Sequence, residues 1–470
     1  MSAPAVAATL ADLRPAPGSP VPAWLADTRE WALGQLEVLG LPTQRDEDWK
    51  YLRLAPVLDV SFAVSSDADS HGLTAEALAT LAPDLGGSRL VFANGHLVTE
   101  LSTMPDPGSG VTVTSLASVL ATDPDRLEPL FAGRAAPADG MAALNLALAD
   151  DGAFIHLATG AHADAPIHVV FCTTDVGHPV LASTHSLVVA DPDSSATVVE
   201  THIGVGPLAS AACANAVTRV VLAPQATVHH YTVQDLPDTT FHLGVVDVTA
   251  DHDSTFTAHT LSLGAAIARH EVRVHLDGDG ADATITGLYQ PAGNQYHDHP
   301  VLVEHNTTNC TSRQIYNGVL DDHGHGVFNG RIMVAPAGMG TDATQSNRNL
   351  VLSDRAEVDT RPRLEILADD VKCAHGATVG QLDETAVHYL RTRGIPEPAA
   401  RGMLTYAFAT EMVDRIGPPA LRAWAAQLVA DRLGAVLGDD GPPPDANPDA
   451  DAGAGTGPGT GSVDTEEVTP

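Results

Sequence analysis

Positive charge is scarce in this chain. Its 470 residues hold 24 lysines and arginines against 59 acidic residues, which gives a formal net charge of −35. Only two of the bases are lysines, Lys50 and Lys372. A surface this acidic repels nucleic-acid phosphates and anionic lipid headgroups. We therefore expect neither a nucleic-acid partner nor a membrane partner.

Several catalytic and targeting signatures are also missing. There is no G-x-x-x-x-G-K-[ST] loop of a P-loop ATPase and no G-x-S-x-G nucleophile elbow. No apolar run approaches the roughly 18–20 residues of a membrane span, and the N-terminus shows no signal-peptide pattern. The four cysteines lie far apart without a C-x-x-C, which fits neither a disulfide framework nor a self-contained zinc finger. We expect a cytoplasmic protein.

The patterns that are present divide the chain into four parts. Residues 1–87 are predicted to be a helical region, because the stretch 22–39 places Trp24, Trp31 and Leu36 near one helical face. Residues 88–380 read as a β core of short strands between Gly, Asp and Pro turns. The helical period returns in 381–437. Residues 438–470 are acidic, rich in Pro and Gly and almost without large apolar groups, so we expect a disordered tail.

A loose internal repeat runs through the β core. A turn, a small residue and a new strand recur at Ala196, Ala226, Ser254 and Ala283, at intervals of 30, 28 and 29 residues. Stacked coils give a period in this range, whereas turns in a β-sandwich usually recur about every 8–12 residues. The stretch EVRVHL at 271–276 also alternates strictly between apolar and charged residues. The spacing favours a right-handed parallel β-helix over other all-β folds.

Two short patterns contain potential metal ligands. His297, His299 and Glu304 have the H-x-H-x₄-E spacing of a cupin metal motif, which makes a cupin-like metal-dependent oxygenase or isomerase the alternative function. The later glycine and the second cupin motif are missing. In KCAH, strand alternation puts Cys373 and His375 on one face, and the ammonium of Lys372 is expected to lower the pKa of the Cys373 thiol slightly. Two ligands cannot close a tetrahedral site, so this pair is either half of a site completed by another protein or a packing feature.

Longer motifs resemble the SufB/SufD family of iron–sulfur cluster assembly proteins. They are ARHEVRVHLDGDGADATITGLY, CTSRQIYNGVLDD, GVFNGRIMV, TDATQSNRNLVLSD, DTRPRLEILADDVKCAHGATVG and YLRTRGIPEPAARGMLTYAF. Weaker matches reach forward to RDEDWKYLRL and MAALNLALADDGAFIHL, so that only the two ends of the chain are left out. Gly376 and Val379-Gly380 after the histidine, and Leu390 where some SufB sequences have a cysteine, make the chain more similar to the SufD branch.

The resemblance implies a fold, partners and site residues. It implies a parallel β-helix flanked by helical segments, which pairs with SufB through one end while a transient iron–sulfur cluster forms at the interface. His375 would be the metal-ligating residue there, with Cys373 as a weaker candidate, and a sulfur donor is a further expected partner. The SufC ATPase would dock on the C-terminal helices, for which we expect contacts from Tyr389, Arg393, Met403, Tyr406 and Phe408. The chain would then be a non-catalytic scaffold without a tightly bound cofactor, and a homodimer outside the full complex stays open.

Overall fold

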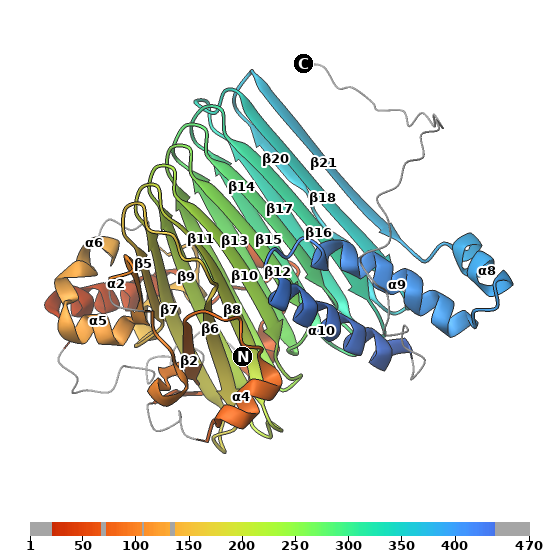
Figure 1. The fold of residues 1–470 in the computed structure, drawn as a ribbon, viewed down its shortest axis with the longest axis horizontal. Coiled ribbons are helices and arrows are strands. Elements are labelled where there is room, and N and C mark those ends of the chain that lie inside the picture. Colours follow the sequence, from red (N-terminus) through yellow and green to blue (C-terminus); the bar gives the residue numbers. More distant parts are fainter. Residues whose placement is uncertain (1–20, 67–71, 106–107, 132–136, 438–470) are drawn as a thin grey trace.

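The computed structural model describes residues 21–66, 72–105, 108–131 and 137–437. The segment 438–470, predicted from its composition to be disordered, lies outside the described residues. Within them the chain is mainly β, with 42% strand and 25% helix, and forms a parallel β-solenoid of about 8 turns with helices before and after it. Figure 1 shows the strands stacked in chain order, with the two helical parts on opposite sides. The predicted fold class is confirmed.

Two sheets form the walls of the solenoid. We call the 11-stranded sheet, ordered β19-β17-β15-β13-β11-β9-β7-β5-β4 with β1 and β20 at its side, sheet A, and the 10-stranded sheet, ordered β21-β18-β16-β14-β12-β10-β8-β6-β2-β3, sheet B. The strands of sheet A are β1 (Ala63–Val64), β4 (Val111–Ser115), β5 (Ala153–Leu157), β7 (Val180–Ala190), β9 (Ala212–Leu222), β11 (Thr240–Ala250), β13 (Ile267–Leu276), β15 (Tyr296–His305), β17 (His325–Val334), β19 (Glu357–Thr360) and β20 (Arg363–Ile366). Those of sheet B are β2 (Arg89–Ala93), β3 (His96–Leu97), β6 (Ile167–Thr174), β8 (Ser195–Val205), β10 (Thr227–Asp235), β12 (Thr255–Ser262), β14 (Asp282–Tyr289), β16 (Thr311–Leu320), β18 (Thr341–Val351) and β21 (Val371–Gly380).

The strand register corrects the repeat read from the sequence. Ala196 of β8 pairs with Val228 of β10, which pairs with Phe256 of β12 and then with Ala283 of β14. The small residues Ala226 and Ser254 therefore lie two positions before the partners of Ala196, although the interval near 29 residues is right. The small residue marks a turn, whose length varies from coil to coil, and the interior side chains set the register.

An apolar interior fills the space between the two sheets. Its buried residues come from both walls, among them Val198, Val228, Phe256, Val272 and Val274. The alternation predicted for 271–276 is confirmed. Val272, Val274 and Leu276 belong to this core, whereas Glu271, Arg273 and His275 line a cavity on the outer face of sheet A.

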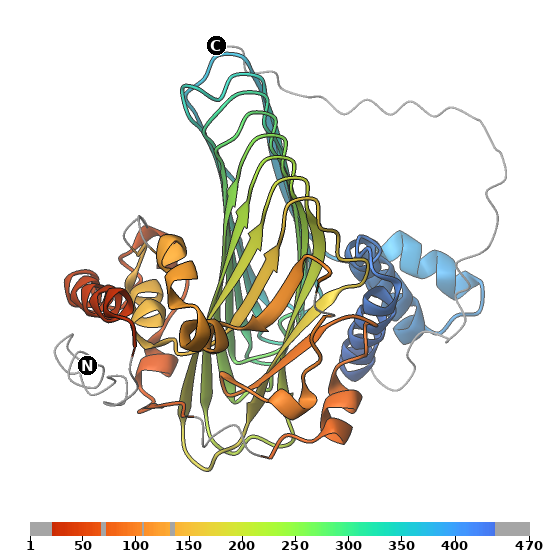
Figure 2. The same cartoon turned by 60° about the vertical axis from the view of Figure 1, so that its left-hand side comes forward.

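Helices cover the outer faces of both sheets. They are α2 (Ala23–Leu39), η1 (Glu47–Trp49), α3 (Ala55–Leu58), α4 (Ala75–Leu81), η3 (Thr99–Leu101), α5 (Leu116–Thr122), η4 (Pro124–Arg126), α6 (Glu128–Phe131), α7 (Gly140–Leu148), α8 (Glu384–Thr392), α9 (Glu397–Val413) and α10 (Pro419–Leu437). Figure 2 shows α2 and α5–α7 on one side of the solenoid and α8–α10 on the other, whereas α4 packs on sheet B. The short helices α5, α6 and α7 lie inside the range 88–380, where the sequence predicted strands. In the described part of the chain, no helix combines the length and apolar character needed to cross a membrane.

Each helical layer is attached by its own apolar cluster. Ala32 and Leu36 of α2 and the buried face of α7 pack on Leu181, Leu187 and Phe241 of sheet A. On sheet B, a second cluster joins the two last helices to the wall; its members include Leu261, Leu288, Val319, Met412, Val413, Leu421, Ala425 and Val429. The C-terminal helices thus bury one face on the β core, as their amphipathic pattern requires.

Candidate functional site

The C-terminal end of the solenoid leaves a strand uncovered. β21 is the terminal strand of sheet B and pairs on one side with β18, from Thr341 opposite Val371 to Leu350 opposite Gly380. Eight of its ten residues are exposed, and the other two are half-buried. A parallel strand with a free side offers a row of backbone N–H and C=O groups to another chain. Lys372 is the one lysine or arginine in VKCAHGATVG, so few charged side chains hinder this edge from pairing with another chain.

His375 stands at this open end, over the mouth of the solenoid interior. Its register partner is the buried Gln345 of β18, which in turn faces the buried Gln314 of β16. Gln345 Nε2 donates to Gln314 Oε1 at 2.6 Å, so a polar column leads from the interior to His375. The imidazole of His375 makes no hydrogen bond or ion pair within the described residues, and both ring nitrogens are therefore available to a ligand.

Cys373 lies two residues before His375, on the same face of β21. It is half-buried and packs at the margin of a small cluster formed by Ile332, Val334 and Ala343. Burial raises the pKa of the Cys373 thiol, and the nearby carboxylate of Asp342 acts in the same direction. The expectation that Lys372 lowers this pKa is wrong, because Lys372 points to the opposite face of the strand. The thiol therefore stays protonated at neutral pH.

The residues predicted to contact an ATPase divide into two groups. Tyr389 and Arg393 are exposed on and just after α8, where the Arg393 guanidinium stacks 5.2 Å from the Tyr389 ring. Tyr406 and Phe408 are partly buried against the sheet B cluster, and Met403 is half-buried on α9. Tyr389 and Arg393 thus form the more accessible part of this set.

The cupin-like triad does not assemble. His297 and His299 are fully buried and point into the solenoid. Glu304 is an odd number of residues from both, so it projects from the opposite, outer face of β15. Glu304 instead accepts a hydrogen bond from His275 Nδ1 at 2.7 Å. Within the described ranges, no three His, Cys, Asp or Glu side chains are grouped to hold a metal ion. The geometry therefore contradicts the metal-dependent alternative.

Histidine is instead a component of the solenoid interior. The His202 ring lies 4.5 Å from the His242 ring, and His242 lies 6.1 Å from His270. Burial lowers the pKa of His202 to about 4 and those of His270 and His297 to about 3. These side chains are neutral at physiological pH, and the sequence patterns did not distinguish them from the exposed His375.

The polar column behind His375 was also missed from the sequence. Gln314 and Gln345 are separated by about one coil, so the repeat interval was the signal that could have placed them together with His375. Tyr289, Asn347 and Asn349 form a second hydrogen-bonded network beside them in the interior. Asn347 Nδ2 donates to Tyr289 Oη at 3.2 Å, and Asn349 Nδ2 donates to Asn347 Oδ1 at 2.6 Å. The interior is thus polar towards its open end.

Two family models match adjacent segments of the chain. The model described as "SUF system FeS cluster assembly, SufBD core domain" matches residues 171–408, which include β21, α8 and most of α9. The model described as "SufBD protein N-terminal region" matches residues 19–169. Together they cover nearly all of the described chain.

Curated relatives point the same way. The iron–sulfur cluster assembly protein SufD of Escherichia coli (strain K12) is 32% identical over 404 residues, which are 85% of this chain and 91% of that protein. An iron–sulfur cluster assembly SufBD family protein of Synechocystis sp. is 30% identical over 414 residues, 87% of this chain and 91% of its own length. The SufD protein of Bacillus subtilis (strain 168) is 26% identical over 403 residues, with 84% and 91% covered.

Proposed function

The chain belongs to the SufBD family and has a role in SUF iron–sulfur cluster assembly; we propose that within this system it is a SufD-type scaffold that pairs with SufB through β21. The observation that carries the proposal is the open end of the solenoid. An exposed parallel strand is completed most simply by a strand of a related solenoid, which has the same strand spacing and twist.

His375 is proposed as this chain's ligand for the cluster under assembly. Imidazole nitrogen is a competent iron ligand in iron–sulfur centres, and His375 has both nitrogens free. Because the described residues offer no group of three ligands, the remaining ligands, including thiolates, would come from SufB. Iron and sulfide are the cargo of this reaction, and the chain needs no tightly bound cofactor of its own.

Cys373 has a secondary role in this proposal. Its raised pKa keeps the sulfur protonated, and the thiolate is the form that binds metal and attacks sulfur donors. Its contacts with the cluster around Ile332 and Val334 support the strand that carries His375. A sulfur donor would therefore act through the partner's thiols.

The C-terminal helices are proposed to bind the SufC ATPase. α9 and α10 are fixed to sheet B by a buried apolar cluster, so a force applied to them reaches the wall that ends in β21. The aromatic ring of Tyr389 is 56% exposed on α8, and Arg393 lies beside it. Aromatic and arginine side chains are the usual anchors of protein interfaces. ATP hydrolysis would belong to SufC, and this chain would be a non-catalytic cytoplasmic subunit.

The scarcity of lysine gives a direct test of the SufB contact. Lys372 is exposed on β21 of sheet B, whereas Lys50 is exposed directly after η1, which pairs through Asp48 with Arg363 of sheet A. We expect an amine-reactive cross-linker, applied to a complex co-expressed with SufB and SufC, to join Lys372 to SufB. Lys372→Arg, which keeps the charge but removes the primary amine, should abolish that cross-link without affecting co-purification. Cross-links to SufB from Lys50 alone would contradict the proposal.

A further inference from the structure

A row of arginines crosses the outer face of sheet A. The register places six residues side by side on neighbouring strands, namely Arg219, Asp247, Arg273, Leu302, Arg331 and Arg363. Neighbouring strands lie about 4.8 Å apart, so four guanidinium groups share a short strip of surface. The strip is unusual in a chain of net charge −35 that has only 24 lysines and arginines.

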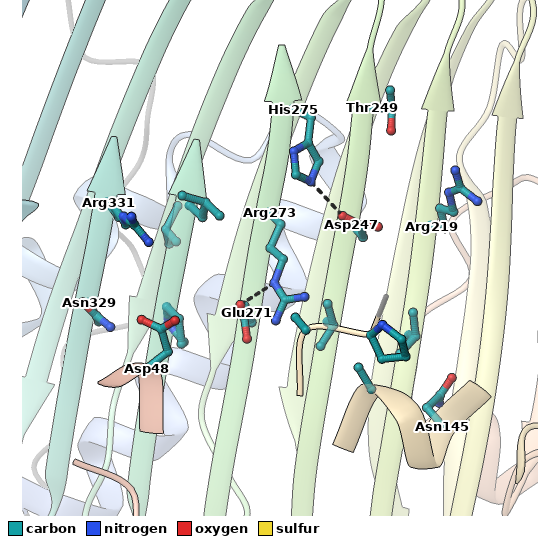
Figure 3. A pocket seen from close by; sticks show the side chains of 18 of the residues that line it. Asp48, Asn145, Arg219, Asp247, Thr249, Glu271, Arg273, His275, Asn329 and Arg331 are labelled. Atoms are coloured by element: carbon teal, nitrogen blue, oxygen red, sulfur yellow. Dashed lines mark hydrogen bonds and ion pairs between the residues drawn. The ribbon is translucent and has the colours of Figure 1, made fainter. Parts of the chain in front are cut away.

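The whole row lines one cavity. The cavity has a volume of about 490 Å³ and lies between sheet A and the N-terminal helical part, as Figure 3 shows. At one end Ala142 and Leu146 of α7, together with Val217 and Val245, supply an apolar part of the wall beside the polar Asn145 and His185. Volumes of about 300–1,000 Å³ with an apolar wall and a few polar groups are typical of small-molecule sites.

Three of the four arginines are already paired. Arg273 Nε lies 2.5 Å from Glu271 Oε1, and Arg331 Nη2 lies 2.7 Å from Glu365 Oε2. Arg363 Nη2 lies 3.2 Å from Asp48 Oδ1. These pairs fix the geometry of the row and leave other N–H groups of each guanidinium free.

Arg219 makes no ion pair with an acidic side chain in the described part of the chain. Its Nη1 donates to the backbone oxygen of Leu130, and this contact orients the guanidinium. Asp247, its neighbour in the row, is paired with His275, whose Nε2 lies 3.3 Å from Asp247 Oδ1. Hydrogen bonds to Asp247 and Glu304 raise the pKa of His275 to about 10, so one imidazolium is shared between two carboxylates at neutral pH. Arg219 is thus a half-buried cation that makes no ion pair of its own, although its charge adds to the effect of His275 in lowering the pKa of the neighbouring Asp247.

We propose that this cavity binds a small organic anion, with a phosphate or carboxylate group on Arg219 and Arg273 and an apolar body against Ala142, Leu146, Val217 and Val245. A guanidinium offers two parallel N–H donors that match either oxyanion. Because Arg219 makes no ion pair of its own, its remaining N–H groups can donate directly to a bound anion. The two arginines proposed to hold the anion lie on β9 and β13 of sheet A, not on the terminal strands β20 and β21.

The test uses phenyl phosphate, which carries both an aromatic ring and a dianion. Isothermal titration of the full-length chain at low ionic strength should show binding with a Kd of about 1 mM or tighter. Inorganic phosphate should bind more weakly, because it cannot use the apolar wall. Arg219→Gln should weaken phenyl phosphate binding at least about tenfold, since it removes a charge-assisted contact.

Two variants serve as controls. Arg355→Gln changes the net charge equally in an exposed turn and should leave the affinity unchanged. Ala142→Leu fills the apolar end without altering any charge, so it should weaken phenyl phosphate but not inorganic phosphate; it also serves if Arg219→Gln fails to fold. No binding at 10 mM phenyl phosphate, about ten times the upper expected Kd, or equal binding by Arg219→Gln or Ala142→Leu, would overturn the proposal. The isolated chain is sufficient for this measurement, so its result is separate from that of the SufB cross-link.

Discussion

The two ends of the solenoid are finished in different ways. At the N-terminal end, sheet B finishes in the antiparallel pair β2–β3 and sheet A in the antiparallel pair β4–β5. Leu78 of α4 packs there against Val91 and Val170 on the outer wall of sheet B. At the C-terminal end, both sheets stop at parallel strands, and β21 is exposed along its length.

This difference separates the part of the chain that is self-sufficient from the part that needs a partner. Repeat folds require terminal caps, because each coil buries its faces only against its neighbours. The N-terminal end of this chain supplies its own cap, whereas the C-terminal end leaves the last coil without one. Substitutions near the N-terminal end should therefore affect folding, and those on β21 should affect association.

The largest effect is expected from acid acting on the interior histidines. Burial depresses their folded pKa values, to about 3 for His270 and His297 and about 4 for His202. Between these values and the unfolded value near 6.5, the unfolded chain binds more protons, so stability is full above about pH 6.5 and falls as the pH drops. At pH 5 each of these histidines should lower the free energy of unfolding by about 2 kcal/mol. Urea unfolding at pH 7.5 and pH 5 measures the loss, and equal midpoints at both pH values would contradict it.

A core truncation at the capped end should come next. The Phe92 side chain on β2 is fully buried, with its ring 5.2 Å from that of Phe171. Phe92→Ala should lower the free energy of unfolding by about 3–5 kcal/mol. The matched change at the open end, Leu364→Ala on the half-buried β20, should cost only about 1 kcal/mol. Chemical denaturation of both variants checks the comparison, and equal losses would mean that the open end is as well packed as the capped one.

An edge substitution should leave stability unchanged and disrupt association. Val379 on β21 is 53% exposed and lies on the open edge of sheet B. Val379→Arg should change the free energy of unfolding by less than about 0.5 kcal/mol and weaken binding to SufB at least about tenfold, because it adds a charge to a buried contact. Val38→Arg on α2, where the valine is 80% exposed, is the matched control. Unchanged SufB binding by Val379→Arg would place the interface elsewhere.

The sequence predicted the β-solenoid because its strands alternate with the period of a pleated sheet and its turns recur near one coil. It did not predict α5, α6 and α7, since their short apolar runs are shared by strands and helices. It assigned His297 and Glu304 to one metal site, although a spacing of seven residues places them on opposite faces of a strand. The residue types match a metal-ligand set, but their odd spacing does not fit one face of a strand.

The candidate site was predicted in part. His375 and Cys373 were identified through family motifs, but the openness of β21 depends on which strand ends the sheet, and only the full topology shows that. The arginine row is similar. Arg219 and Arg273 are far apart in the chain and become neighbours of Asp247 only through the register of three strands. Contacts between coils need the exact number of residues in each turn, which local patterns do not provide.

The central claim is that His375 at the open end serves cluster assembly and not folding. The most direct measurement is the iron and sulfide content of the anaerobically purified complex with SufB and SufC, carrying His375→Ala, with His323→Ala in an exposed turn as control. We predict that His375→Ala loses the cluster while SufB co-purifies normally and the unfolding midpoint stays the same, and that Cys373→Ala is milder. A normal cluster yield with His375→Ala would contradict the claim, and loss of SufB from that variant would make His375 a structural residue of the interface.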